Sequence, residues 1–222
     1  MVIDAGFTRA DALRIAANVL DSGKELKTIY VSQADPDYYF GVETIKEIFP
    51  TAEVVTTPAV LEKINAKLAG KIAFWGPKMG ANAPRTPVLP KAISGTTLTV
   101  DGQTVEIRGT TGPLAHRPYA WIPSIKAVVG NIGVFGTNMH VWTADTQTVA
   151  ERSAWVAQLD EMAALQPTVV VPGHMPAGTA LDVSNVTYTK GYLQAFEKNA
   201  AATQTSAELI DAMKKAYPAA PM

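Results

Sequence analysis

Short apolar runs and helix-like spacing of apolar residues alternate along the first third of the chain. Runs of roughly four to eight apolar residues between turn residues are typical of buried strands, and apolar positions that recur every three to four residues are typical of helices. An order of strand, helix, strand and helix is typical of an α/β layered fold. The pattern predicts strands at 1–3, 27–32 and 53–57 and helices at 9–20, 42–49 and 59–69.

The third of these helices leads into an irregular sequence. Pro58 is expected at its first position, and Gly70 is expected to end it. Residues 75–90 then contain four prolines and two glycines, which predicts a segment without regular structure. Long segments of this kind in compact domains often cover a binding site, so we expect Trp75 to lie in a lid.

Strand signals dominate the next part of the chain. Asp101 and Gly102 separate two apolar runs and predict a β-hairpin. Thr148 and Glu151 have the spacing of a capping box at the start of a long helix. We find no repeat and no low-complexity linker, and we expect a single domain over residues 1–222. The predicted elements are strands at 96–100, 103–108, 119–122, 126–129 and 168–171 and helices at 149–165, 186–201 and 206–217.

Composition excludes several classes of protein. The 222 residues include no cysteine, so disulfides, thiolate zinc sites and cysteine nucleophiles are excluded. A net charge of −1 lacks the basic excess of a nucleic-acid-binding protein. No apolar run approaches the roughly 18 residues of a membrane span, and the first residues lack the pattern of a signal peptide. We therefore expect a small molecule, and neither nucleic acid nor membrane, as the partner.

Candidate chemistry gathers where predicted strands end, which is where active sites of α/β folds are found. Asp4 follows the first strand, Asp35 and Asp37 follow the second, and His174 follows the strand at 168–171. Two neighbouring carboxylates could bind a metal or raise each other's pKa, but Asp-Pro-Asp is also a common start of a helix. His174 could likewise be a metal ligand or a structural hydrogen-bonding residue.

Aromatic residues and the other two histidines lie in or near the irregular segments. No Gly-rich nucleotide loop and no serine-hydrolase elbow is present, which disfavours nucleotide, flavin and serine-hydrolase functions. A substrate pocket is therefore expected from the aromatic and histidine side chains near the strand ends, namely Tyr38, Trp75, His116, His140 and Trp142.

The order of four motifs resembles the metallo-β-lactamase fold superfamily over essentially the whole chain. VIDAG at 2–6 is similar to a strand ending in Asp-x-Gly, and IYVSQADPDYYFG at 29–41 is similar to a strand followed by T-H-x-H-x-D-H-x-x-G. IPSIKAVVGN at 122–131 resembles a hairpin ending in Gly-Asp, and VVVPGH at 169–174 resembles a strand ending in Gly-His. The resemblance implies an αββα sandwich of two mixed β-sheets flanked by helices.

The same resemblance places few of the family's metal ligands in this chain. Gln33 and Asp35 stand at the first two histidines of the motif, and Tyr38 stands at the last. Asn131 stands at the aspartate that bridges two metals. Only Asp37 and His174 match outright, while Thr111 lies nearest to a further expected histidine, with His116 as a candidate substitute.

Three interpretations of this substituted site stay open. One is a single metal held by Asp35, Asp37 and His174. Another is manganese or magnesium, rather than zinc, on an oxygen-rich set that adds Gln33 and Asn131. The third is a pocket without metal. The first two imply a hydrolase of an ester, amide or phosphoester in which Asp37 is catalytic, and the third implies a pseudoenzyme or a small-molecule binding protein.

The resemblance also concerns location. Members of the superfamily normally have one or two strands before the Asp-x-Gly strand, whereas Met1 begins almost on it. Proteins with a similar DPDYYFG motif resemble exported proteins with leaders. Either the fold lacks an edge strand, or an upstream segment is absent from this chain, and the resemblance favours the second alternative, with a periplasmic or secreted protein whose leader is absent.

Overall fold

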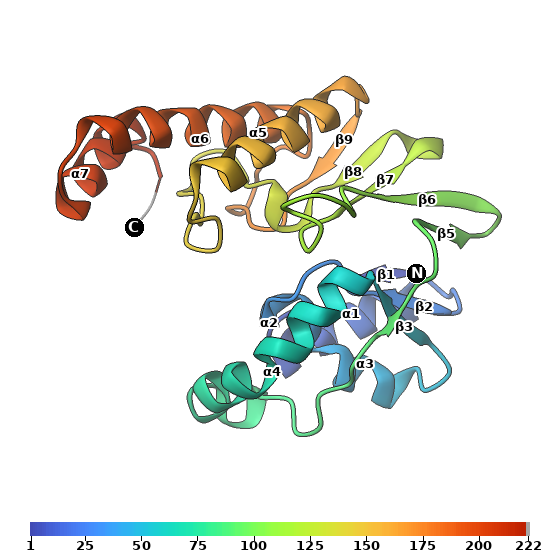
Figure 1. The fold of residues 1–222 in the computed structure, drawn as a ribbon. Coiled ribbons are helices and arrows are strands. Elements are labelled where there is room, and N and C mark those ends of the chain that lie inside the picture. Colours follow the sequence, from blue (N-terminus) through green and yellow to red (C-terminus); the bar gives the residue numbers. More distant parts are fainter. Residues whose placement is uncertain (221–222) are drawn as a thin grey trace. The chain divides into compact units, whose positions relative to one another are not determined.

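The computed structural model describes residues 1–220, which divide into two compact units. Unit 1 comprises Met1–Val100 with Ala115–Pro118, and unit 2 comprises Asp101–Leu114 with the chain from Tyr119 onward. The structure contains two β-sheets with helices packed beside them, as expected from the sequence (Figure 1). That the whole chain forms one domain stays a prediction.

The first sheet is parallel throughout and has the strand order β1-β2-β3-β4. Ile29 in the second strand pairs with Val2 on one side and Val54 on the other. Each crossover between neighbouring strands contains a helix, as parallel pairing requires, so only the second sheet is mixed. The strands are β1 (Val2–Ile3), β2 (Thr28–Tyr30), β3 (Glu53–Thr56) and β4 (Lys91–Ala92).

The helices of unit 1 lie along one face of this sheet (Figure 1). Thr8 and Asp11 form a complete capping box at the first helix, as the sequence predicts for Thr8. Ile29, Ile45 and Ile64 are fully buried between helices and sheet. The helices are α1 (Arg9–Asp21), α2 (Pro36–Tyr39), α3 (Val42–Ile48) and α4 (Pro58–Met79).

Helix α4 is the clearest departure from the sequence prediction. It does not end at Gly70 but continues through Trp75 to Met79, with Pro77 inside it. The cause is a stripe of core contacts with helical spacing, because Leu68, Ile72, Trp75 and Met79 all pack against the buried cluster of unit 1. This packing outweighs the roughly 1 kcal/mol by which a glycine weakens a helix. The expected irregular segment is therefore shorter than predicted, and Trp75 is not part of a loop.

The second sheet has the order β5-β6-β7-β8-β9. Strands β6, β7 and β8 pair in antiparallel fashion, and β8 pairs with β9 in parallel. Asp101 and Gly102 both have positive φ, as the predicted hairpin requires. The strands are β5 (Thr97–Val100), β6 (Gln103–Arg108), β7 (Tyr119–Ile122), β8 (Ala127–Val129) and β9 (Val169–Val171).

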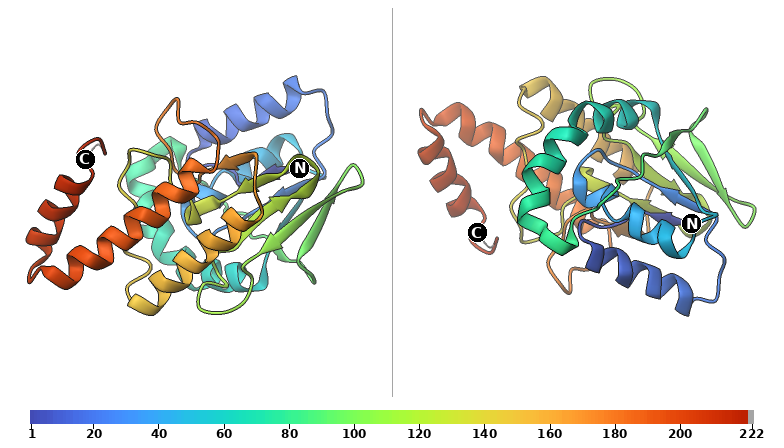
Figure 2. Two further views of the ribbon diagram at one scale, coloured as in Figure 1. Left: turned by 90° about the horizontal axis from the view of Figure 1, so that it is seen from above. Right: turned by 90° about the horizontal axis from the view of Figure 1, so that it is seen from below.

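Three helices complete unit 2, namely α5 (Val149–Ala164), α6 (Ser184–Ala202) and α7 (Ser206–Ala216). Thr148 and Glu151 form the predicted capping box of α5. The buried face of α5 carries Trp155, Leu159 and Met162. Figure 2 shows α6 and α7 diverging from their short connection, which gives the end of unit 2 a V-shaped pair of helices.

Most predicted helices and strands are confirmed with small shifts of their ends. The sequence analysis missed α2 and β4, which have four and two residues. Elements this short carry no periodicity, because a pattern needs several repeats to be recognised. Within residues 1–220, no helix has the length and apolarity needed to cross a membrane.

Candidate functional site

The strand ends of unit 1 are held together by a hydrogen-bonded turn. Asp4 has a positive φ of 65°, and its carboxylate accepts hydrogen bonds from the backbone nitrogen and the hydroxyl of Ser32, each at 2.7 Å. The backbone nitrogen of Ala5 donates to the carbonyl of Tyr38 at 2.9 Å. Gly41 approaches this turn so closely that a Cβ atom there would lie 2.0 Å from the carbonyl oxygen of Ala5. The turn after β1 therefore fixes the position of α2.

The carboxyl group of Asp4 has a pKa well above that of an ordinary aspartate. Burial of its carboxyl, with a smaller contribution from the charge of Asp37, raises the pKa of Asp4 to about 7. The two hydrogen bonds from Ser32 act in the opposite direction because they stabilise the carboxylate. Asp37 is thus close enough for its charge to disfavour ionisation of Asp4.

Asp35 interacts with a lysine from another helix. It is the N-cap of α2, with extended backbone, but its side chain does not cap the helix. Instead, its Oδ1 lies 3.3 Å from Nζ of Lys71 in α4, and the two side chains are only 18% and 30% exposed. The helix-start interpretation of Asp-Pro-Asp is therefore confirmed for the backbone, while the carboxylate of Asp35 has a cation beside it.

Three other residues of unit 1 that the sequence predicts for the site, Gln33, Asp37 and Tyr38, differ in how far they are buried. Gln33 is buried, and its Oε1 accepts a hydrogen bond from the backbone nitrogen of Ala34 at 2.7 Å. Tyr38 is buried, and its pKa is raised well above the usual range by burial and by Asp37. Arg117 is also buried, and its charge acts on Tyr38 in the opposite direction. Asp37 lies half-buried in the same unit.

Asn131 and His174 lie at the ends of neighbouring parallel strands of unit 2. Asn131 is buried with a positive φ of 39°, and its Oδ1 accepts a hydrogen bond from the backbone nitrogen of Gly133 at 3.0 Å. His174 is half-buried, its ring lies 5.5 Å from that of Phe135, and its carbonyl accepts from Gly136 at 2.7 Å. The backbone after β9 is therefore fixed by the loop that follows β8.

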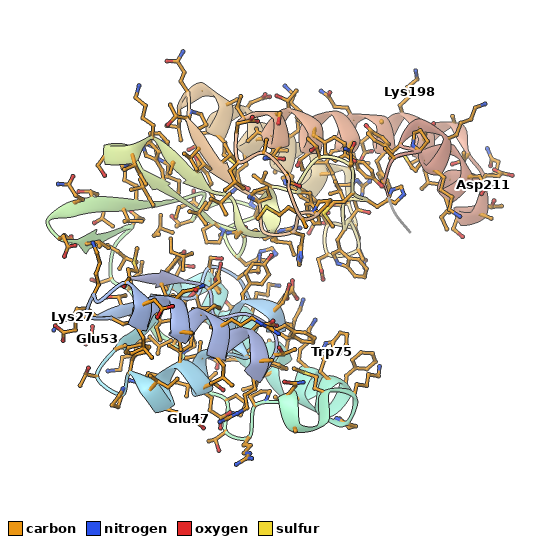
Figure 3. The ribbon with its side chains drawn as sticks, turned by 180° about the vertical axis from the view of Figure 1, so that it is seen from behind. Lys27, Glu47, Glu53, Trp75, Lys198 and Asp211 are labelled. Carbon is orange, nitrogen blue, oxygen red and sulfur yellow. The ribbon has the colours of Figure 1, made fainter. Side chains whose placement is uncertain are left out.

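The predicted pocket residues do not form a group within either unit. Trp75 packs edge-on against Phe7, with ring centres 5.0 Å apart, and Figure 3 shows it on the last turns of α4. His140 contacts α6, whereas Trp142 is 58% exposed. His116 is half-buried in unit 1. Their roles in substrate binding stay predictions.

The side chains present do not fit the metal centre that the sequence resemblance implies. Across residues 1–220, no group of three or more histidine, aspartate or glutamate side chains could hold a metal ion. Two of the expected oxygen ligands, those of Gln33 and Asn131, accept backbone hydrogen bonds. Asp35 has the ammonium group of Lys71 beside it. These three side chains therefore already have partners inside the protein.

Sequence reasoning missed Lys71, although a signal for it exists. The core-facing stripe of α4 contains apolar residues at 64, 68 and 75, and Lys71 lies between them with the same spacing. A charged residue in such a stripe is unusual and needs a partner of opposite charge. The stripe was not recognised because the helix was expected to end at Gly70.

The comparisons with known proteins concern the fold. No protein-family profile matches the chain, and no curated protein is similar to it in sequence. A metallo-β-lactamase family protein from Thermus thermophilus has a similar structure, with a TM-score of 0.64, 17% identity, and coverage of 98% of this chain and 80% of that chain. The chain has the metallo-β-lactamase fold. The fold expected from the four motifs is thereby confirmed.

Two further structures share the metallo-β-lactamase fold. A metallo-β-lactamase from Pontibacter korlensis has a TM-score of 0.62 and 20% identity, covering 86% of this chain and 80% of that chain. The DIM-1 metallo-β-lactamase has a TM-score of 0.57 and 15% identity, covering 86% of this chain and 79% of that chain. These similarities establish the fold, and the chemistry of this chain has to be argued from its own side chains.

Proposed function

We propose that this chain is a small-molecule binding protein that uses the metallo-β-lactamase fold without a resident metal. The observation that carries the proposal is the pairing of Asp35 with Lys71, 3.3 Å apart in unit 1. In the sequence resemblance, Asp35 stands at a metal-binding histidine. The lysine therefore places a protein cation beside the position where the fold otherwise uses a metal.

Electrostatics opposes a divalent ion at Asp35. A metal bound to its carboxylate would lie about 2 Å from the oxygen, and Nζ of Lys71 is 3.3 Å from the same residue. A divalent ion about 5 Å from an ammonium group is repelled by roughly 7 kcal/mol at an effective dielectric constant of about 20. This repulsion lowers the affinity of Asp35 for a divalent ion as long as Lys71 stays beside it.

The amide side chains support the same conclusion. Gln33 and Asn131 each use their carbonyl oxygen to accept a backbone N–H, at 2.7 and 3.0 Å, and both are buried. Recruiting either oxygen to a metal would weaken a hydrogen bond inside the protein, at a cost of about 1–3 kcal/mol for each backbone group left without a partner. Their geometry suits a role in shaping the loops.

Lys71 also suggests the chemistry of the ligand. An ammonium group has three donors, and one contact to Asp35 leaves capacity for others. A half-buried lysine next to a strand end suits a ligand with a negatively charged or hydrogen-bond-accepting group. We therefore propose small polar molecules of this kind as the ligands.

Metal titration of the full chain tests the proposal. We expect the wild-type protein and Lys63→Met, an exposed position of α4, to bind less than about 0.1 equivalent of zinc or manganese by isothermal titration and metal analysis. Binding of about one equivalent by the wild-type protein would contradict the proposal. In a thermal-shift screen of small carboxylic and phosphoric acids, a stabilising ligand should lose its effect in Lys71→Met but keep it in Lys63→Met and Asp37→Ala.

A second candidate is a hydrolase with one metal on Asp35, Asp37 and His174. Two observations favour it, because Asp37 and His174 match the superfamily motifs and His174 lies directly after a strand end. This candidate predicts tight binding of one zinc or manganese ion and ester hydrolysis that Asp37→Ala abolishes. The titration above therefore separates the two functions.

A further inference from the structure

Unit 2 contains a separate cavity, of about 260 Å³, between α6, α7 and the loop that follows β8. Its walls come from Tyr192 and Phe196 of α6, from Leu209, Ile210 and Met213 of α7, and from His140. Nearly all of the surface that faces the cavity is apolar. We propose that this cavity binds a small molecule with an apolar body and one negatively charged group, such as a medium-chain carboxylate.

The size of the cavity restricts the ligand. A water molecule in the liquid occupies about 30 Å³, so the cavity offers the space of roughly nine water molecules. An aliphatic chain of similar size, with its polar end toward solvent, fits that space. A helix or folded partner would not enter it, although a single side chain could.

Aromatic rings pack against Tyr192 in the wall of the cavity. The ring of Tyr192 lies tilted against that of Tyr217 with centres 4.6 Å apart, and the rings of Tyr217 and Tyr188 pack edge-on with centres 5.7 Å apart. Nδ1 of His140 lies 3.0 Å from the hydroxyl of Tyr192, so these two polar groups satisfy each other beside the cavity. A preformed apolar cavity of this kind binds without a large loss of protein entropy.

The ammonium group of Lys214 favours a ligand with a negatively charged end. Lys214 lines the cavity and is half-buried, and it makes no ion pair with any of the residues 1–220. No acidic side chain lines the cavity in the described part of the chain. Asp211, labelled on α7 in Figure 3, is exposed and is not among the lining residues. The ammonium group of Lys214 is thus the charge that an anionic ligand would meet.

The neighbouring lysine provides a matched control. Lys214 and Lys215 both lie in the last turn of α7, where a positive charge interacts favourably with the helix dipole. Lys215 is exposed and does not line the cavity. An effect that is specific to Lys214 therefore reports on the cavity and not on the helix end.

The test uses octanoate and the uncharged octan-1-ol as probes of the full chain. We expect octanoate to bind saturably, with a dissociation constant below about 10 mM by isothermal titration and by NMR. Binding should be weak, because a ligand of this size makes few apolar contacts. Lys214→Met should weaken octanoate binding at least about fivefold while leaving octanol unchanged, as loss of one charge contact predicts. Lys214→Arg should retain octanoate binding, and Lys215→Met should match the wild-type protein.

A variant that fills the cavity tests whether the probes bind inside it or elsewhere on the protein. Ile210 is 53% exposed, so Ile210→Trp should fold normally while occupying the cavity. We expect it to abolish binding of both probes with an unchanged circular dichroism spectrum. The proposal is overturned if octanoate does not bind, if Lys215→Met weakens it as much as Lys214→Met, or if Ile210→Trp binds normally. A wild-type dimer that Ile210→Glu dissociates would also overturn it, because a second copy would then cover the cavity.

Discussion

The strand ends of the two units are built from different kinds of polar group. In unit 1 they carry charge, with Asp4, Asp35 and Lys71 in or beside the buried turn. In unit 2, neutral side chains of α6 bind the loop that follows β8, since Thr189 accepts a hydrogen bond from the backbone of Phe135 at 2.9 Å and Asn185 accepts one from Thr137 at 3.1 Å. In both units, therefore, a helix supplies a polar side chain to a segment that follows a β-strand.

The difference shows two ways to stabilise a buried polar strand end. A neutral side chain is satisfied by one or two backbone hydrogen bonds, and unit 2 uses this solution. A buried carboxylate needs a cation or a proton, and unit 1 uses both, with Lys71 beside Asp35 and a raised pKa at Asp4. The free energy of unfolding should therefore depend on pH and on charge substitutions in unit 1, and on core substitutions in unit 2.

The largest expected effect is in the core of unit 2. Trp155 is fully buried, and its Nε1 donates to the carbonyl of Gly133 at 2.7 Å. We expect Trp155→Ala to lower the free energy of unfolding by about 4 kcal/mol in denaturant titrations, because it leaves a large cavity and an unpaired carbonyl. Trp142→Ala, at an exposed position, should change it by less than about 0.5 kcal/mol. Equal losses of stability in Trp155→Ala and Trp142→Ala would show that core packing does not dominate the stability of unit 2.

A steric substitution in unit 1 should have the next largest effect. Gly41→Ala would place a Cβ atom 2.0 Å from the carbonyl oxygen of Ala5 and 2.8 Å from Cβ of Ala12. The turn after β1 must shift, and we expect a loss of about 3 kcal/mol in the free energy of unfolding. Gly76→Ala is the control, since no other group lies within 4 Å of a Cβ at that helical position. It should be neutral or stabilising.

Asp4 should make the stability of the protein depend on pH. Its pKa rises from 3.8 in the unfolded chain to about 7 in the fold. The raised value favours the protonated folded state, so this contribution is fully present below about pH 4 and is lost as the pH rises through about 7. We expect Asp4→Asn, which tolerates the same positive φ, to remove most of this pH dependence, about 1.4 kcal/mol for each unit by which the pKa is raised.

Urea titrations between about pH 4 and pH 8 measure this change. A control with the opposite sign is Asp182, whose pKa is lowered by hydrogen bonds from Ser184. Its contribution is present at neutral pH and is lost as the pH falls through the lowered pKa. If Asp4→Asn leaves the wild-type pH profile unchanged, Asp4 is ionised at neutral pH and the charge comparison fails.

The smallest expected effect is that of a surface ion pair in unit 2. Lys190 and Asp160 are 2.5 Å apart, with side chains 33% and 54% exposed. Lys190→Met should lower the free energy of unfolding by less than about 0.5 kcal/mol, and this difference should disappear in about 1 M salt. A larger or salt-independent loss would show that unit 2 also depends on charge.

Much of the fold could be predicted from the sequence. The capping residues Thr8 and Thr148, the hairpin at Asp101 and Gly102, and the apolar strands act through neighbouring residues, so the local pattern contains the information. The order of the strand-end motifs also indicated the metallo-β-lactamase fold. The short elements α2 and β4 were missed because four and two residues are too few to show a periodic pattern.

The candidate site was less accessible to sequence reasoning. The pattern identified Asp35, Gln33 and Asn131 as polar groups after strands, and it left open whether they bind a metal. Their partners are set by distant or backbone groups, such as Lys71, which lies 36 residues from Asp35. Such pairings require the helix α4 to extend past Gly70, which depends on packing in the core.

The sequence by itself determined most of the strands and helices and which polar residues follow the strands, because those properties depend on local spacing. Only the tertiary structure decided what those polar residues contact. It carried α4 on to Met79, brought Lys71 to Asp35, turned Gln33 toward its own loop, and placed Lys214 beside an apolar cavity. The physical reason is that burial removes water, so each charge or amide must be matched by whichever group the packing brings close.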